Sequence, residues 1–90
     1  MINGLQIILA RNILGFSQEE LADRIDGISL STIGRLEKNR YEVYKKGIIG
    51  NLIILEKYFR EKNIKFIDKN GEVGVVINRE KGKKLEKAKK

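Results

Sequence analysis

The sequence predicts a mainly α fold, in which four helices are followed by a short β-hairpin. Along residues 3–62, apolar residues recur at intervals of three and four, which is the period of an amphipathic helix. After residue 62 the pattern changes to two short β-branched or aromatic runs on either side of Asn70-Gly71, a pair typical of hairpin turns. We therefore expect a helical domain over residues 1–62, a hairpin over 63–78 and a basic tail over 79–90.

The first helix is expected over residues 3–14, ended by Gly15. The second is expected over 18–25, because Ser17 can act as an N-cap with Glu20 as its capping-box partner. The apolar stripe of the first helix is Leu5, Ile8, Leu9, Ile13 and Leu14.

A third helix is expected over residues 30–37, after a tight turn at Asp26-Gly27 and with Ser29 as its N-cap. Ala22, in the preceding helix, is small enough to let two steeply crossing helices approach. A helix-turn-helix of this shape places its second helix in the major groove of DNA.

The fourth helix is expected over residues 47–62, and its apolar set is wider than one core-facing stripe requires. Ile54 lies off that face. Two interpretations stay open: part of this helix meets a partner chain, or it is simply the most buried helix of a small domain. The apolar set is Ile48, Ile49, Leu52, Ile53, Leu55, Tyr58 and Phe59.

The hairpin runs are Ile64–Ile67 and Val73–Ile77, which predicts a connecting loop longer than two residues. Because an isolated two-stranded hairpin is only marginally stable in water, it must pack on the helices or pair its edge with another chain.

Composition excludes several classes of protein. The 90 residues contain no cysteine and no histidine, so a disulfide framework is excluded and a transition-metal site or histidine-based catalysis is not expected. No carboxylate pair, nucleophile–base set or phosphate-binding glycine loop is visible, so we predict no enzyme and no cofactor. No apolar run long enough for a membrane span and no signal peptide are recognised, and a cytoplasmic protein is expected.

The net charge of +7 is concentrated in the tail. Residues 1–62 hold 10 Lys or Arg against 8 Asp or Glu, whereas residues 79–90 hold 7 against 2. The tail adds phosphate contacts in one interpretation and is a solubilising end in the other. The case for DNA binding therefore depends on the motif and not on the total charge.

That motif consists of FSQEELA at 16–22, GIS-x-STI at 27–33 and RLEKN at 35–39. It resembles the helix-turn-helix of the Xre/Cro family of phage-repressor-like regulators, over about Leu5 to Phe59. The resemblance implies a four-helix repressor-like DNA-binding domain, and the hairpin resembles the one in a subset of small Xre-type proteins, where it is a candidate dimer contact. One departure is Asp26, which places the turn glycine a residue later than is usual in the family.

The resemblance places Leu30, Ser31 and Arg35 at base-reading positions. Arg35 has the donors for guanine O6 and N7, and Ser31 suits either kind of base. Leu30 either contacts a thymine methyl or packs inward. Gly34 lets the helix backbone approach a neighbour, which is either DNA or the first helix.

Phosphate contacts position such a module without reading sequence. The resemblance implies one for Gln18, at the start of the second helix, where the alternative is a plain helix former. The other candidates for phosphate contact are Thr32, Lys38, Asn39, Arg40, Lys45 and Lys46. Arg11 and Glu37 match positions of a partly buried structural ion pair in the family.

We therefore predict a sequence-specific DNA-binding regulator, a repressor or an antitoxin-like autoregulator, that binds double-stranded DNA as a homodimer. The alternative is a protein-interaction module that uses the hairpin edge and the fourth helix, with DNA binding secondary. The orientation of Gln18, Ser31 and Arg35 discriminates between them, because a DNA-binding surface requires all three to face the same way as the loop lysines.

Overall fold

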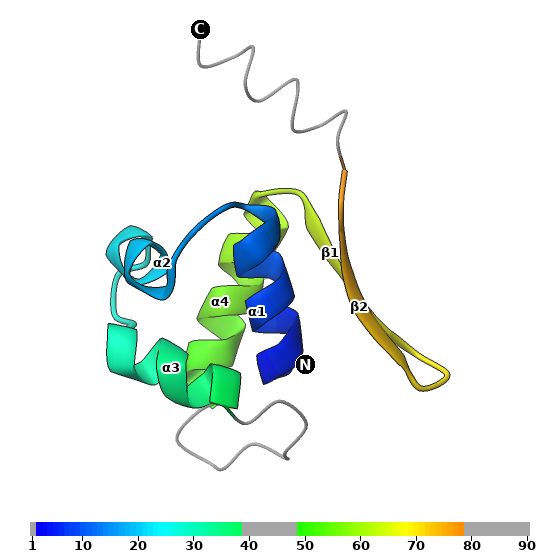
Figure 1. Cartoon of the computed structure of the whole chain (residues 1–90), viewed down its shortest axis with the longest axis horizontal. Helices are drawn as coiled ribbons and strands as arrows, with labels where there is room; N and C mark the ends of the chain where they lie inside the picture. Colours follow the sequence, from blue (N-terminus) through cyan, green and yellow to red (C-terminus); the bar gives the residue numbers. More distant parts are fainter. Residues whose placement is uncertain (1, 39–48, 79–90) are drawn as a thin grey trace, which may run out of the picture.

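The computed structural model of the chain describes residues 2–38 and 49–78, and it has the predicted architecture of four helices followed by an antiparallel hairpin (Figure 1). The candidate residues Asn39, Arg40, Lys45 and Lys46 and the basic tail lie outside the described residues. The elements are α1 (Gly4–Ile13), α2 (Gln18–Arg24), α3 (Leu30–Lys38), α4 (Ile49–Glu61), β1 (Ile64–Lys69) and β2 (Glu72–Ile77).

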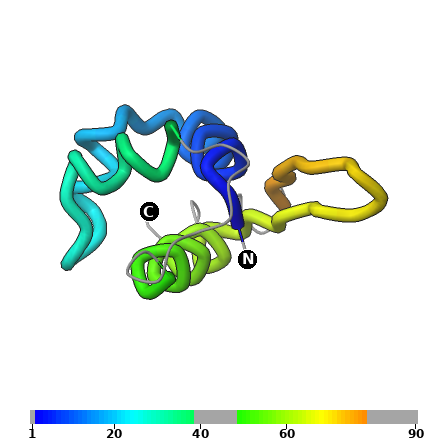
Figure 2. The backbone as a smooth tube through the Cα atoms, turned by 90° about the horizontal axis from the view of Figure 1, so that it is seen from below, coloured from blue at the N-terminus to red at the C-terminus, as the bar shows by residue number. Residues whose placement is uncertain are grey.

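Figure 1 shows α2 and α3 on one side of α1 and the hairpin on the other, and the view from below in Figure 2 has the same order. The helix-turn-helix and the hairpin therefore lie at opposite ends of the molecule's long dimension, which measures 41 Å.

Reciprocal capping boxes fix where α1 and α2 begin. In α2, the Ser17 hydroxyl accepts from the Glu20 backbone N–H at 3.1 Å, and the Glu20 carboxylate accepts from the Ser17 N–H at 3.0 Å. These bonds lower the pKa of Glu20. In α1, Asn3 and Gln6 form the same box at 2.9 and 3.1 Å. Each box satisfies N–H groups that would otherwise lack a partner at a helix start.

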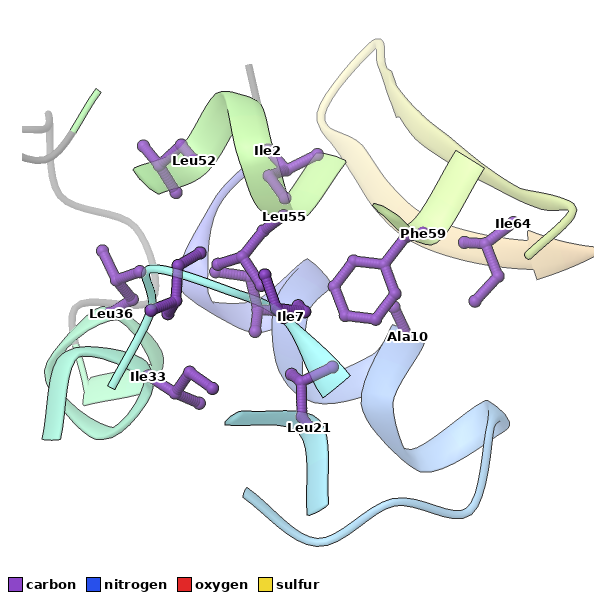
Figure 3. Packing of buried hydrophobic residues seen from close by; sticks show 12 residues of the cluster. Ile2, Ile7, Ala10, Leu21, Ile33, Leu36, Leu52, Leu55, Phe59 and Ile64 are labelled. Atoms are coloured by element: carbon purple, nitrogen blue, oxygen red, sulfur yellow. The ribbon is translucent and has the colours of Figure 1, made fainter. Parts of the chain in front are cut away.

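The hydrophobic core draws on all four helices and on the first residue of β1 (Figure 3). Phe59 is the largest of the fully buried side chains. The buried apolar residues of the described part are Ile2, Ile7, Ala10, Leu21, Ile25, Ile28, Ile33, Leu36, Leu52, Leu55, Phe59 and Ile64.

Helix α4 buries one face and leaves the other apolar but open. Leu52, Leu55 and Phe59 are fully buried, whereas Ile53 is 59% exposed and Ile54 is 42% exposed. Ile49 is also exposed. This exposure argues against the interpretation that α4 is simply the most buried helix, because its outer face still presents apolar area to solvent.

The hairpin turn is shorter than the sequence predicted. Lys69 pairs with Glu72, so the loop is only Asn70-Gly71, and both residues have positive φ angles, 55° and 78°. Positive φ at both central residues is the signature of a type I′ turn, whose twist matches that of the strands. The expectation of a longer loop was wrong because three charged residues, Asp68, Lys69 and Glu72, complete the strands despite their low β propensity.

The hairpin is packed on the helices. The side-chain amide of Gln6, itself 1% exposed, donates to the carbonyl oxygens of Ile67 at 3.0 Å and Gly74 at 3.3 Å, one on each strand. The Phe66 ring meets Phe59 edge to face, with centroids 6.0 Å apart. Packing on the helices therefore stabilises a two-stranded sheet that would be marginal alone.

Candidate nucleic-acid interface

Two buried isoleucines anchor the turn between α2 and α3 in the core. Ile25 and Ile28 are both buried, and between them Asp26 is exposed and Gly27 has a φ of +85°. A residue with a side chain is strained at that angle. These two isoleucines, on either side of a glycine in the left-handed conformation, thus fix the direction in which α3 leaves the turn. The additional turn residue, Asp26, is exposed to solvent and does not disturb this packing.

The start of α3 is capped by a hydroxyl cluster. Ser29 Oγ accepts from the Thr32 backbone N–H at 3.2 Å and lies 2.9 Å from Thr32 Oγ1 and 3.1 Å from Ser31 Oγ. Ser29 therefore acts as the N-cap. The half-buried Thr32 hydroxyl is engaged in the cap, while Ser31 lies on the exposed side.

Helix α3 has an inner and an outer face. Ile33, Leu36 and Glu37 are buried against the rest of the domain. Ser31, Arg35 and Lys38 are exposed and, spaced by four and three residues, share the opposite face. Leu30 is 45% exposed, so the structure does not have it packed into the core.

An open groove lies along this outer face. We call it the α3 groove, and its lining includes Gln18, Ser31, Gly34, Arg35, Glu37 and Lys38. It brings the first residue of α2 together with the exposed stripe of α3. Gln18, Ser31 and Arg35 thus border one surface, and the loop lysines, Lys45 and Lys46, that a DNA-binding face would add to it lie outside the described residues.

A buried polar network lies behind the groove. The Glu37 carboxylate, 6% exposed, accepts from Arg11 Nε at 2.9 Å and from Arg11 Nη2 at 3.0 Å. Arg11 Nη1 donates to the Phe16 carbonyl oxygen at 2.9 Å. The hydrogen bond to Glu37 raises the pKa of Arg11. The bidentate pair joins α1 to α3 and also holds the loop that leads into α2.

Gln18 belongs to the same network. Its side-chain Nε2 donates to Glu37 Oε1 at 3.0 Å. This bond was not predicted, because nothing in the sequence spacing of Gln18 and Glu37 indicates that they meet. Its effect is to fix the amide of Gln18 at the border of the α3 groove, where only one of its two N–H groups is used within the described structure.

Gly34 lies in the groove lining and has free space beside it. A Cβ atom added there would meet no other described atom within 4 Å. The alternative that Gly34 allows a close approach of the first helix is therefore wrong, because α1 does not come within contact distance of that position.

Comparison with known proteins finds one similarity, over the helix-turn-helix. Residues 7–43 match the model of a family described as Helix-turn-helix, which covers α2, the turn and α3. Over these residues the chain matches an Xre/Cro-like helix-turn-helix model, and that model describes a family of DNA-binding transcription regulators. No curated protein and no solved structure gives a significant match.

Two further findings concern the described residues alone. None of their helices is long and apolar enough to cross a membrane. No group of three or more acidic, cysteine or histidine side chains is arranged there to hold a metal ion.

Proposed function

We propose that the protein is a sequence-specific transcription regulator that binds double-stranded DNA in the cytoplasm as a homodimer, acting as a repressor or an antitoxin-like autoregulator. The observation that carries this proposal is the α3 groove, where Gln18, Ser31, Arg35 and Lys38 meet on one face of a helix-turn-helix.

In this proposal Leu30, Ser31 and Arg35 contact bases. All three are exposed on the first two turns of α3, the part of a recognition helix that reaches base edges. Phosphates are contacted by Gln18, Thr32 and Lys38, together with Asn39, Arg40, Lys45 and Lys46 after α3. Thr32 is the weakest of these candidates, because its hydroxyl already bonds to Ser29.

The first experiment is a selection from random duplexes, followed by binding measurements on the selected sequence. Arg35→Ala is expected to lose about 1–3 kcal/mol of affinity and to relax the preference at one base pair. Lys38→Ala is its matched control, since it removes a cation from the same face and should weaken selected and random duplexes alike. Equal losses on both duplexes for the two variants would refute Arg35 as a base-reading residue.

A homodimer needs a contact between copies, and we propose the hairpin for it. Strand β2 has no charged residue between Glu72 and Ile77, and Val76 is 44% exposed on it. Strand β1, in contrast, carries Lys65, Asp68 and Lys69. Charged side chains on an edge strand oppose pairing with another chain, so β2 is the strand suited to pair with a second copy.

Point substitutions test the dimer contact without removing the hairpin. Val76→Lys changes an exposed side chain and is expected to convert a dimer into a monomer in sedimentation equilibrium. Ile53→Lys, on the open face of α4, is the companion variant. Dissociation by Ile53→Lys alone would assign the contact to α4, and an unchanged dimer mass for both variants would leave neither surface as the interface.

The exposed apolar face of α4 supports a second candidate function, that of a protein-interaction module. The exposed isoleucines at positions 49, 53 and 54 suit a protein partner, as expected of an interaction module in which DNA binding is secondary. Failure of the selection to return any consensus, together with capture of one defined partner that Ile53→Lys abolishes, would favour this candidate.

A further inference from the structure

Gly34, in the lining of the α3 groove, is the one position on the groove side of α3 that has no side chain. We propose that the α3 groove receives a phosphodiester group of the DNA backbone, and that Gly34 is the point where this group passes directly against the helix. The inference rests on the proposed function and adds to it a positioning role for Gly34.

Packing among the described residues does not explain the glycine. Its backbone lies within α3, it is not among the residues with positive φ, and a Cβ would meet no described atom within 4 Å. Glycine is among the least favourable residues in a helix interior. An alanine would therefore fit the isolated protein better, and the reason for the open space lies outside the described chain.

The groove walls have the chemistry of an anion site. The exposed cation Lys38 and the amide of Gln18 line the groove together with the apolar Ile8, and Arg35, whose guanidinium the proposed function assigns to a base, adds positive charge beside them. Among the described residues of the lining, Glu37 alone carries a carboxylate, and its bidentate pair with Arg11 neutralises that charge. Cations and N–H donors match phosphate oxygens, which accept hydrogen bonds and cannot donate them.

The network behind the groove makes this site rigid. Glu37 holds one N–H of the Gln18 amide at 3.0 Å, which directs the rest of that group to the groove border. A phosphate on this border can approach the helix closely only where no side chain intervenes, which is at Gly34. Because a phosphate contact carries no base information, its loss should weaken binding to every sequence alike.

The test uses Gly34→Ala and Gly34→Leu, with Gly50→Ala as the matched control. Gly50 is an exposed glycine in α4 that also has no described atom within 4 Å of an added Cβ. Both alanine variants should unfold at the same or a higher temperature than the wild type. On the selected and the random duplex alike, Gly34→Ala should bind about fivefold and Gly34→Leu about fiftyfold more weakly, and Gly50→Ala should bind normally.

Uncharged methylphosphonate linkages, placed one at a time along the selected duplex, identify the phosphate. Several positions are expected to weaken the wild type, and one of them should have no further effect on Gly34→Leu. Normal binding by both Gly34 variants would overturn the inference, and a loss restricted to the selected duplex would assign Gly34 to a base contact instead. If the wild type binds no duplex at all, the proposed function itself is refuted, and this result differs from normal DNA binding by the Gly34 variants, which refutes only the role of Gly34.

Discussion

Replacing Glu37 with glutamine should lower the free energy of unfolding more than a conservative substitution on the surface does. Glu37→Gln keeps the volume of the side chain but removes the charge that accepts from Arg11 Nε, Arg11 Nη2 and Gln18 Nε2. It leaves the Arg11 guanidinium, whose side chain is 15% exposed, without a counter-charge. Removing one partner of a buried pair costs about 3–5 kcal/mol.

The lower end of that range applies, because Arg11 is partly hydrated and keeps its bond to the Phe16 carbonyl oxygen. We therefore expect a loss of about 3 kcal/mol in the free energy of unfolding by urea. For a domain of this size, that corresponds to a fall of roughly 12–24 °C in melting temperature. Such a loss is a large part of the total stability of a small domain.

The matched control is Glu56→Gln. Glu56 pairs with Arg60 at 3.4 Å on the surface of α4, where the Arg60 side chain is 67% exposed, and such pairs contribute at most about 1 kcal/mol. In a double-mutant cycle, Arg11→Met with Glu37→Gln should cost less than the sum of the two single changes, because neither charge is then left alone. An additive cycle, or equal losses for Glu37→Gln and Glu56→Gln, would refute the reasoning.

Three further predictions concern other parts of the fold. Gln6→Ala should destabilise the protein by about 2–4 kcal/mol in urea unfolding, since two carbonyl contacts and half of a capping box are lost, and hairpin amides should exchange faster. The pKa of Glu20 is lower in the folded protein than its ordinary value of 4.5, so its carboxylate stabilises the fold above pH 4.5, and this stabilisation is lost as the pH falls through the pKa of the folded state. Glu20→Gln should therefore make the free energy of unfolding less dependent on pH in the acid range. Gly71→Ala should lower the melting temperature because its φ is +78°, with Gly74→Ala as the control at an ordinary φ.

Most of the fold could be predicted because its boundaries are encoded locally. The helices begin and end within two residues of the expected positions, except that the first two residues expected of α4 are not described. Ser17 with Glu20, and the glycines at positions 15 and 27, give local signals that need no tertiary information. Asn3 followed by Gln6 is a local signal of the same kind, and it marks the start of α1.

The candidate site was less predictable, since its contacts join distant segments. The outer face of α3 follows from helical period alone, which is why Ser31 and Arg35 could be placed on it. The bond from Gln18 to Glu37 and the space beside Gly34 depend on how helices cross, which sequence spacing does not determine. The base and phosphate contacts themselves stay predictions.

Gln6 has a consequence for how this chain can be dissected. Its amide spans both strands of the hairpin, and Ile2 and Ile64 are both 3% exposed or less. Removing the hairpin would therefore leave the buried Gln6 amide without its two acceptors, and it would remove Ile64 from the core near the start of α1. The helix-turn-helix and the hairpin should therefore unfold in a single cooperative transition. A truncation ending near residue 62 would destabilise the helical domain, so a loss of dimerisation in that variant would not by itself show that the hairpin is the dimer contact.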